Sequence, residues 1–272
     1  MSGGAEDAKP PPRTWQPLTF GGVAACARAR VGPLLAAQLA AAMMVGACAV
    51  WFFHRAYCPV ILQAIQKMPE TARVAEGQLQ GVPETLVSES RFLAIVVAPR
   101  LGGDIGQDAD VQIQLRQTDF CAGTIFRPDW GWAMPYGKGA AGGLGRSNLE
   151  PWWGAWEPML LAAAGAAVVV MMLVLWAVPA LVYTAPARFI AWFADRQLSW
   201  SGAWRLASAA MLPGTLVVAG AIILYGCAVA DLVGLSFFAA VQMIIGWVYL
   251  IGGACKAPRL YSDDLKRNPF TV

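Results

Sequence analysis

Acidic side chains between two apolar runs are the first groups in this sequence that could do chemistry. A pair of carboxylates can hydrolyse a glycoside or peptide when one acts as acid and the other as base or nucleophile. The candidates are Glu70, Glu76, Glu84, Glu89, Asp119 and Asp129. Nothing in their spacing singles out a pair, so the sequence assigns no catalytic residue.

Two short segments invite a ligand hypothesis. The segment GGDIGQDAD contains Asp104, Asp108 and Asp110, but it lacks the alternating ligands and final glutamate of an EF-hand loop. It is predicted to be a solvated turn, with a weak cation site as the alternative. In GKGAAGGLGR, Lys138 does not follow the order of a phosphate-binding loop, so a flexible loop is predicted. No metal or cofactor is assigned.

The single histidine and the cysteines suggest structural roles. His54 directly follows the first apolar run, where interfacial packing is expected, and without a second histidine or a CxxC motif a zinc site has no support. Of six cysteines, only Cys58 and Cys121 lie between the first two apolar runs. They form either a disulfide, if that segment is in an oxidising compartment, or two unpaired thiols, and both alternatives stay open.

Four uncharged apolar runs dominate the rest of the chain, which is 57% hydrophobic and 14% charged. The hydrocarbon core of a bilayer is about 30 Å thick and needs roughly 20 helical residues. We therefore predict four transmembrane helices, at 33–53, 159–182, 207–230 and 232–254. The first run is longer than the apolar region of a signal peptide, so a retained anchor is favoured over cleavage at Cys48.

The basic residues predict the orientation of these helices. They are concentrated in the tail and lead-in 1–32, the segment 183–206 and the tail 255–272, which all lie on one side of a four-span protein. The members are Lys9, Arg13, Arg28, Arg30, Arg188, Arg196, Arg205, Lys256, Arg259, Lys266 and Arg267. The positive-inside rule makes that side cytoplasmic. We expect an inner (plasma) membrane protein with both termini in the cytoplasm, and nucleic-acid binding is not needed to explain the charge.

Residues 54–158 are then an extracytoplasmic domain. Apolar spacing predicts a helix over 59–68, and a strand pair is expected within 71–81, turning near Glu76-Gly77. The run 91–99 is rich in β-branched residues. In 111–116 apolar and polar residues alternate, which predicts a half-buried antiparallel sheet with one solvated face. Glycine, proline and aromatic residues make 127–146 a predicted loop.

The fold class that follows is an α-helical integral membrane protein with four transmembrane helices. An extracytoplasmic α+β domain, mainly antiparallel β, is inserted between the first and second of them. The span interiors carry no charged residue, and their polar residues Gln38, Gln242 and Tyr225 are expected to make interhelical hydrogen bonds.

The third span carries further signals. Ala210/Gly214 and Gly226/Ala230 have the spacing of small residues that pack closely against a neighbouring helix. Pro213 is expected about two turns inside the helix, where either a neighbouring helix or Ser208 and Thr215 could satisfy the backbone group that loses its hydrogen bond. Pro213-Gly214 is either a packing notch or part of a ligand pathway. Residues 197–204, with Trp200 and Trp204, are expected at the cytoplasmic interface.

Two short motifs give the chain a resemblance. Pro69, Val74 and Gly77 have a Pro-x-x-x-x-Val-x-x-Gly rhythm, and Arg205 to Pro213 reads Arg-Leu-Ala-Ser-x-Ala-x-x-Pro. With the layout of spans, these resemble a bacterial membrane protein family of unknown function, some members of which are named maltodextrin-utilisation-associated membrane proteins. The resemblance implies architecture only. It departs at Ala98-Pro99, where such proteins often have an Asp.

The leading functional hypothesis is a non-enzymatic inner-membrane protein whose external domain binds a protein partner or an envelope component, and a membrane or envelope protein is the expected partner. Its basis is a β-rich domain without a catalytic constellation, joined to a bundle without buried charge. The alternative is a transport accessory or permease-like protein, suggested by Pro179 and Pro213-Gly214. A membrane-bound hydrolase is a third hypothesis. The bilayer is an expected partner, and a homo-oligomer is possible.

Overall fold

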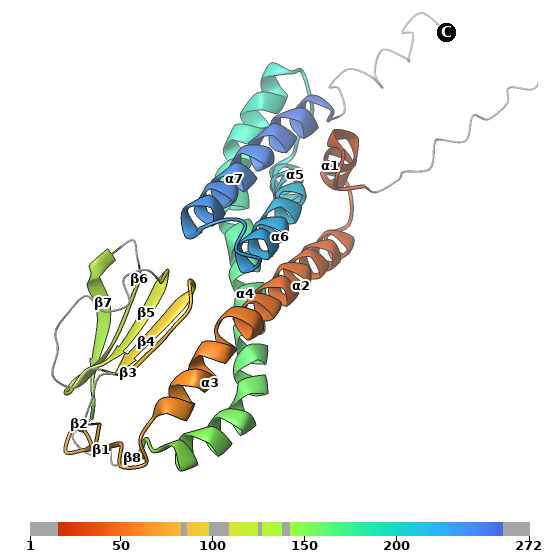
Figure 1. Ribbon diagram of the computed structural model, residues 1–272. Coiled ribbons are helices and arrows are strands. Elements are labelled where there is room, and N and C mark those ends of the chain that lie inside the picture. Colours follow the sequence, from red (N-terminus) through yellow and green to blue (C-terminus); the bar gives the residue numbers. More distant parts are fainter. Residues whose placement is uncertain (1–15, 83–85, 98–108, 125–126, 138–141, 258–272) are drawn as a thin grey trace, which may run out of the picture. The chain divides into compact units, whose positions relative to one another are not determined.

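The computed structural model describes residues 16–82, 86–97, 109–124, 127–137 and 142–257. Its helical segments include four that are long and apolar enough to cross a membrane, which confirms the predicted number of long apolar helices (Figure 1). These four segments are Val31–Lys67, Arg146–Phe193, Trp200–Gly226 and Leu232–Cys255.

Within these segments lie all but the first of the helices. The bounds are α1 Phe20–Cys26, α2 Val31–Ala56, α3 Cys58–Lys67, α4 Arg146–Phe193, α5 Trp200–Ala210, α6 Leu212–Gly226 and α7 Leu232–Cys255. The chain divides into two compact units. The first unit comprises Met1–Val45, Val169–Ala221 and Ser236–Val272, and the second comprises Gly46–Val168 and Ile222–Leu235.

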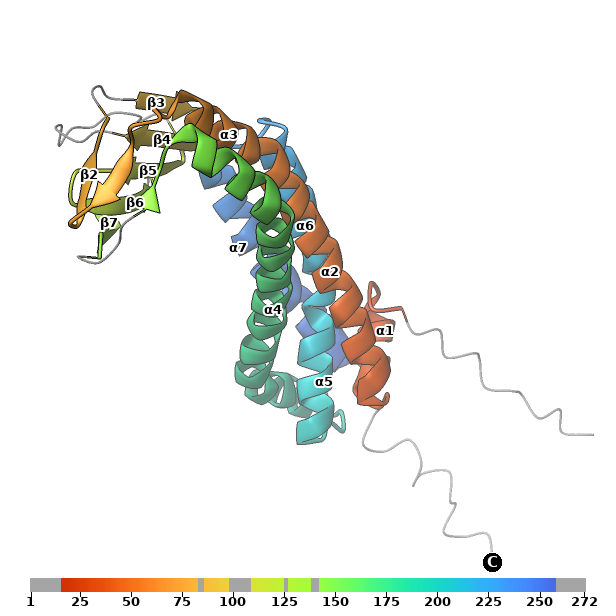
Figure 2. The same cartoon turned by 90° about the horizontal axis from the view of Figure 1, so that it is seen from below.

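The core of the first unit is built around α5. Ala203, Leu206, Ala207 and Ala210 are completely buried, and they recur every three or four residues, so they form one face of the helix. The short helix α1 packs against α5, as both views show (Figures 1 and 2), and its Val23 belongs to the same cluster. The small side chains of α5 therefore serve close packing.

A break at Met211 divides the predicted third span. Ser199 begins α5 as its N-cap, α5 ends at Ala210, and α6 begins at Leu212. Pro213 is thus in the first turn of α6, where a backbone N–H has no intrahelical partner and proline costs no hydrogen bond. The expectation that Pro213 lies two turns inside one helix is therefore wrong. The hydroxyls of Ser208 and Thr215 are buried and have no hydrogen-bond partner among the residues that the structure describes.

The strands all belong to the second unit. Their bounds are β1 Arg73–Ala75, β2 Gln78–Gln80, β3 Leu86–Glu89, β4 Leu93–Val97, β5 Val111–Leu115, β6 Asp119–Thr124, β7 Arg127–Pro135 and β8 Gly142–Gly143. One sheet has the order β2-β1-β8 and the other has the order β3-β4-β5-β6-β7 (Figure 1).

Several predicted elements of this unit are confirmed. Helix α3 spans Cys58–Lys67. Strands β1 and β2 form a hairpin that turns at Glu76 and Gly77, with φ of 53° and 74°, and glycine tolerates this left-handed conformation without strain. The second sheet is mixed, because β4 and β5 are parallel while the other pairs are antiparallel.

The predicted loop over 127–146 is wrong. This stretch contains β7, which at nine residues is the longest strand, then β8 and the first residue of α4. In β7, Trp132 and Met134 alternate with Ala133 and pair across to β6. Cross-strand pairing therefore stabilises a strand whose glycine and proline content is typical of a loop.

Candidate functional site

One face of the five-stranded sheet is covered only in part. Helix α3 packs on this face, where its Val60 contacts a cluster that includes Leu93 and Ile95. The helix contacts β3 and β4. The strands from β5 to β7 continue the same face beyond the helix.

Strand register shows which side chains continue that face. Ile95 is opposite Ile113, which is opposite Ala122, which is opposite Trp132. Residues paired across strands project from the same side of a sheet, so Trp132 lies on the face that α3 covers at Ile95. In the same way, Val97 is opposite Leu115, Leu115 is opposite Phe120, and Phe120 is opposite Met134, so these side chains also share this face.

Exposure rises steeply along this face. Ile95 is 9% exposed, Ile113 is half-buried, and Trp132 and Met134 are 82% and 61% exposed. We call the group Phe120, Ala122, Trp132 and Met134 the β7 surface. Several apolar side chains exposed together on the extension of a core face are more informative than a single exposed hydrophobic residue.

The β7 surface also borders a free sheet edge. Among the strands that the structure describes, β7 ends the order of its sheet, so within that part of the chain no strand pairs with the backbone N–H and C=O groups of its outer side. Such an edge can accept a further strand, and neighbouring apolar side chains then select its sequence. Apolar area and hydrogen-bonding capacity therefore coincide at β7.

A second polar site ties the sheet to residues 225–230. Parallel pairing of Leu93 with Val111 places the N-terminal ends of β4 and β5 side by side. Arg91 and Asp110, which precede these strands, therefore both lie at that end of the sheet. The Tyr225 hydroxyl at the end of α6 donates to Asp110 Oδ2 over 2.7 Å. We call Arg91, Asp110 and Tyr225 the clasp.

Arg91 completes the clasp through backbone carbonyls. Just after the end of α6, Ala228 lies in the left-handed region, at φ 60°. The Val229 amide donates back to the Leu224 carbonyl, as in a Schellman motif. Arg91 donates to the carbonyl oxygens of Ala228 at 2.8 Å and Ala230 at 3.0 Å. These orphan carbonyls are thereby satisfied.

Aromatic rings surround the clasp. The Tyr225 ring lies 5.0 Å from both the Phe52 and Phe92 rings, measured between centroids, and Phe52 also contacts Tyr57. These rings exclude water from the Tyr225–Asp110 hydrogen bond, which is buried. Hydrogen bonds are stronger where water is excluded, so this one is expected to stabilise the clasp.

The clasp corrects two sequence-based predictions. Asp110 was expected in a solvated turn, but it is 8% exposed and bonded to Tyr225. Tyr225 was expected to bond between helices, and it bonds instead to the residue before β5. Asp104 and Asp108 lie outside the described residues, as does Lys138. Arg91 was missed, since only the parallel pairing of β4 and β5 reveals it.

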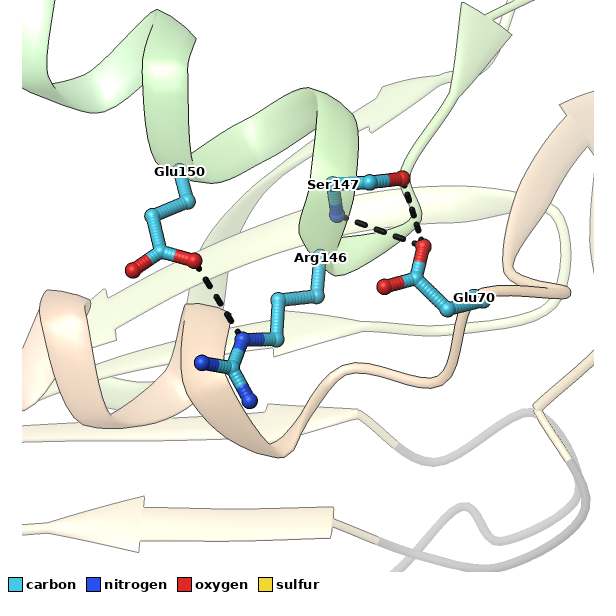
Figure 3. Close-up of polar contacts among 4 residues, drawn as sticks. All are labelled: Glu70, Arg146, Ser147 and Glu150. Carbon is cyan, nitrogen blue, oxygen red and sulfur yellow. Dashed lines mark hydrogen bonds and ion pairs between the residues drawn. The ribbon is translucent and has the colours of Figure 1, made fainter.

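Glu70 is a helix cap. Its Oε2 accepts hydrogen bonds from the Ser147 backbone N–H at 3.2 Å and the Ser147 hydroxyl at 2.6 Å, at the start of α4 (Figure 3). The hydroxyl bond is the main cause that holds the pKa of Glu70 below its usual range. Arg146 beside it pairs with Glu150 at 3.3 Å (Figure 3). Glu70 therefore has a stabilising role at a helix N-terminus.

Replacing Glu70 by glutamine is expected to reduce stability at neutral pH. Because the folded-state pKa is lowered, the contribution of Glu70 is fully present above its unfolded pKa of about 4.3 and is lost as pH falls through the folded value. The difference in unfolding midpoint between wild type and Glu70→Gln should shrink below about pH 4. Thermal unfolding from pH 7 to pH 3 measures it, with the exposed Glu76→Gln as control. A pH-independent difference would contradict the capping role.

The other candidate carboxylates have separate surroundings. Glu76 is in the β1–β2 turn and Glu89 is exposed on β3. Asp119 accepts from the Thr118 hydroxyl at 3.2 Å. Burial, and secondly the charge of Asp119, raise the pKa of Tyr136 to about 12. Glu84 and the side chain of Asp129 lie outside the described residues.

The histidine and cysteines have simple environments. His54 Nε2 is 3.8 Å from Glu157 Oε1, and the histidine side chain is 68% exposed. Cys58 and Cys121 are both free thiols. Cys58 is on α3, which packs on one face of the sheet. Cys121 lies across from Gln114 in the strand register, so its side chain projects from the other face. The sheet therefore separates the two thiols.

Small residues of the third span do pack closely, as predicted. A Cβ atom on Gly214 would lie 2.6 Å from Gln242 Cγ of α7, and one on Gly226 would lie 2.7 Å from the Trp51 ring of α2. Gln38 donates to the Ser208 carbonyl at 3.4 Å, which is an interhelical hydrogen bond as expected. These contacts favour the packing role of Pro213-Gly214.

No family model, curated protein or solved structure matches this chain. The resemblance based on Pro69, Val74, Gly77 and the run from Arg205 to Pro213 therefore stays a prediction, and the site has to be interpreted from its own residues.

Proposed function

We propose that this chain is a non-enzymatic integral protein of a bacterial inner membrane, with both termini in the cytoplasm and residues 54–158 outside. Its external domain binds a protein partner of the membrane or envelope. Four apolar helices and the distribution of basic residues support the location. The observation that carries the function is Trp132, 82% exposed on the edge strand β7.

The occupant proposed for the β7 surface is an extended segment of the partner. A segment that adds to β7 hydrogen-bonds to the free strand edge, and its alternate apolar side chains contact Trp132 and Met134. An isolated hydrophobic ligand would leave the edge unpaired, and a helix would satisfy none of its backbone groups. A strand uses both features of the surface.

Site-specific photocrosslinking in intact membranes tests the proposal. A photoreactive phenylalanine analogue at position 132 should capture one specific protein, whereas the analogue at Leu62, which is 38% exposed on α3, should not. A crosslinked species of twice the chain's mass would assign the surface to a homo-oligomer instead and overturn the partner proposal.

Replacing Trp132 by serine measures its contribution to binding. Interface tryptophans often contribute about 2 kcal/mol or more, so affinity for the captured partner should fall roughly 30-fold. Trp152→Ser is a matched control, because Trp152 is also exposed, at 50%, but lies on α4. Pull-down titration of the three proteins gives the affinities. Equal affinity of wild type and Trp132→Ser would contradict the proposal.

A further inference from the structure

An open cavity lies in the first unit where α4 ends and α5 begins. Its volume is about 350 Å³, near the lower end of the roughly 300–1,000 Å³ of ligand pockets. It is lined by Arg188, Trp192, Arg196, Gln197, Leu198 and Ser199. Two arginines and no acidic residue among the lining groups make it a cationic cavity.

The backbone builds the cavity through a turn after α4. Asp195 adopts φ 53°, and the Arg196 amide donates to the Ala191 carbonyl at 2.8 Å, as in a Schellman motif. The chain then reverses, and Ser199 becomes the N-cap of α5, accepting from the Gly202 amide. Residues 196–199 are thereby held beside the last turns of α4.

Each arginine is held in position by an uncharged group, an aromatic ring for Arg188 and a backbone carbonyl for Arg196. The Arg188 guanidinium carbon lies 4.2 Å from the centroid of the Trp200 ring, a cation–π contact. Arg196 Nη1 donates to the Ala257 carbonyl at 2.7 Å, and its Nη2 has two further N–H donors. Neither arginine pairs with a carboxylate within the part of the chain that the structure describes.

The N-terminus of α5 adds to this positive potential. Because Ser199 lines the cavity, the first N–H groups of this eleven-residue helix are at the cavity wall. The N–H groups of Trp200 and Ser201 have no acceptor within the helix, and the helix dipole favours an anion at this end. Arginine side chains together with free backbone N–H groups are typical of phosphate recognition.

Exposed aromatic rings border the cavity. They are 60% to 68% exposed, and the members are Phe189, Trp192, Phe193 and Trp200. The first three contact one another in a cluster of rings. Aromatic residues at the end of an apolar helix are typical of the membrane interface, at the depth of lipid headgroups.

We propose that this cavity binds the phosphate group of an anionic membrane phospholipid. The phosphate accepts hydrogen bonds from Arg188, Arg196 and the start of α5, and the glycerol and upper acyl chains contact the exposed rings. A free phosphate ion would use the same donors but none of the rings. Basic pockets beside apolar helices at an anionic leaflet have this chemistry. This inference rests on the membrane location of the proposed function, but the cavity shares no residue with the β7 surface, so lipid binding and partner binding are tested independently.

Native mass spectrometry of the full chain in detergent, titrated with phosphatidylglycerol, tests this site. A basic residue near an anionic lipid surface contributes about 1 kcal/mol, so Arg188→Gln should weaken binding about fivefold and the Arg188→Gln/Arg196→Gln double variant roughly 25-fold. Arg146→Gln, at the other end of α4, is the control and should bind as wild type does. Among the described residues Arg188 contacts the Trp200 ring and donates no hydrogen bond, so Arg188→Gln keeps the test valid if Arg196→Gln fails to fold.

Two further measurements show whether the bound phosphate belongs to a lipid headgroup or is a free ion. Phosphatidylcholine, whose phosphate charge is balanced by choline, should bind more weakly than phosphatidylglycerol and lose less affinity in the variants. Inorganic phosphate at millimolar concentration should not displace phosphatidylglycerol. Phosphatidylglycerol binding that is equal in wild type and Arg188→Gln would overturn the proposal. Saturation by inorganic phosphate alone, with no arginine-dependent lipid binding, would overturn the assignment to a lipid.

Discussion

Gly214→Ala is expected to destabilise the first unit by about 3 kcal/mol, at the upper end of the range for overpacking. The added Cβ would lie 2.6 Å from Gln242 Cγ, and 3.0 Å and 3.2 Å from the carbonyl oxygen and Cα of the same residue. Rotation of the Gln242 side chain moves Cγ, but the other two atoms are backbone atoms of α7, and they give way only when the helix backbone shifts. The helices must separate locally.

The same substitution at Gly220 is the matched control. Gly220 is on the same helix, and a Cβ there would meet no atom within 4 Å. Alanine is favoured over glycine in a helix by about 0.5–1 kcal/mol, so Gly220→Ala should be neutral or stabilising. Unfolding of both variants in one detergent, followed by tryptophan fluorescence, gives the comparison. If both variants unfolded with wild-type stability, α6 and α7 would not pack at Gly214 as described.

The second large effect is expected at the clasp. Asp110→Ala removes the acceptor of the Tyr225 hydroxyl and leaves that hydroxyl buried without a partner. A hydrogen bond to a charged group contributes about 1.5–3 kcal/mol, and an unsatisfied buried group costs about 1–3 kcal/mol. The free energy of unfolding of the second unit should therefore fall by about 2–4 kcal/mol.

A double-mutant cycle separates this hydrogen bond from other effects. Tyr225→Phe combined with Asp110→Ala should destabilise less than the sum of the two single variants, because each removes the same bond. Glu89→Ala, an exposed acidic residue on neighbouring β3, is the control and should change stability by under about 0.5 kcal/mol. Additive losses in the cycle would show that Tyr225 and Asp110 do not interact.

The helices and one hairpin could be predicted from the sequence because their signals are local. An uncharged run of 20 or more apolar residues forms a helix wherever backbone groups lack water, and four such helices are present. Glu76-Gly77 has residues suited to a tight turn, and the β1–β2 hairpin turns there. Spacing of small residues also indicated the close approach at Gly214 and Gly226.

The β7 surface could not be predicted because its signal is not local. Glycine and proline within Arg127–Pro135 are typical of a loop, and only pairing with β6 makes this stretch a strand. The exposure of Trp132 depends on how far α3 extends over the sheet. That extent depends on packing between elements distant in sequence, and a pattern of residues does not contain it.

The sequence alone was enough to predict the features that depend on neighbouring residues. These are the four apolar helices, the intervening domain of a helix and strands, and the grouping of basic residues at a few places. The tertiary structure decided which polar residues meet. Asp110 and Tyr225 are 115 positions apart, and they meet because β4 and β5 are parallel and α6 ends beside them. Arg188 and Arg196 form one cavity because Asp195 reverses the chain. Contacts of this kind depend on how the chain folds back on itself, and side-chain type by itself does not encode them.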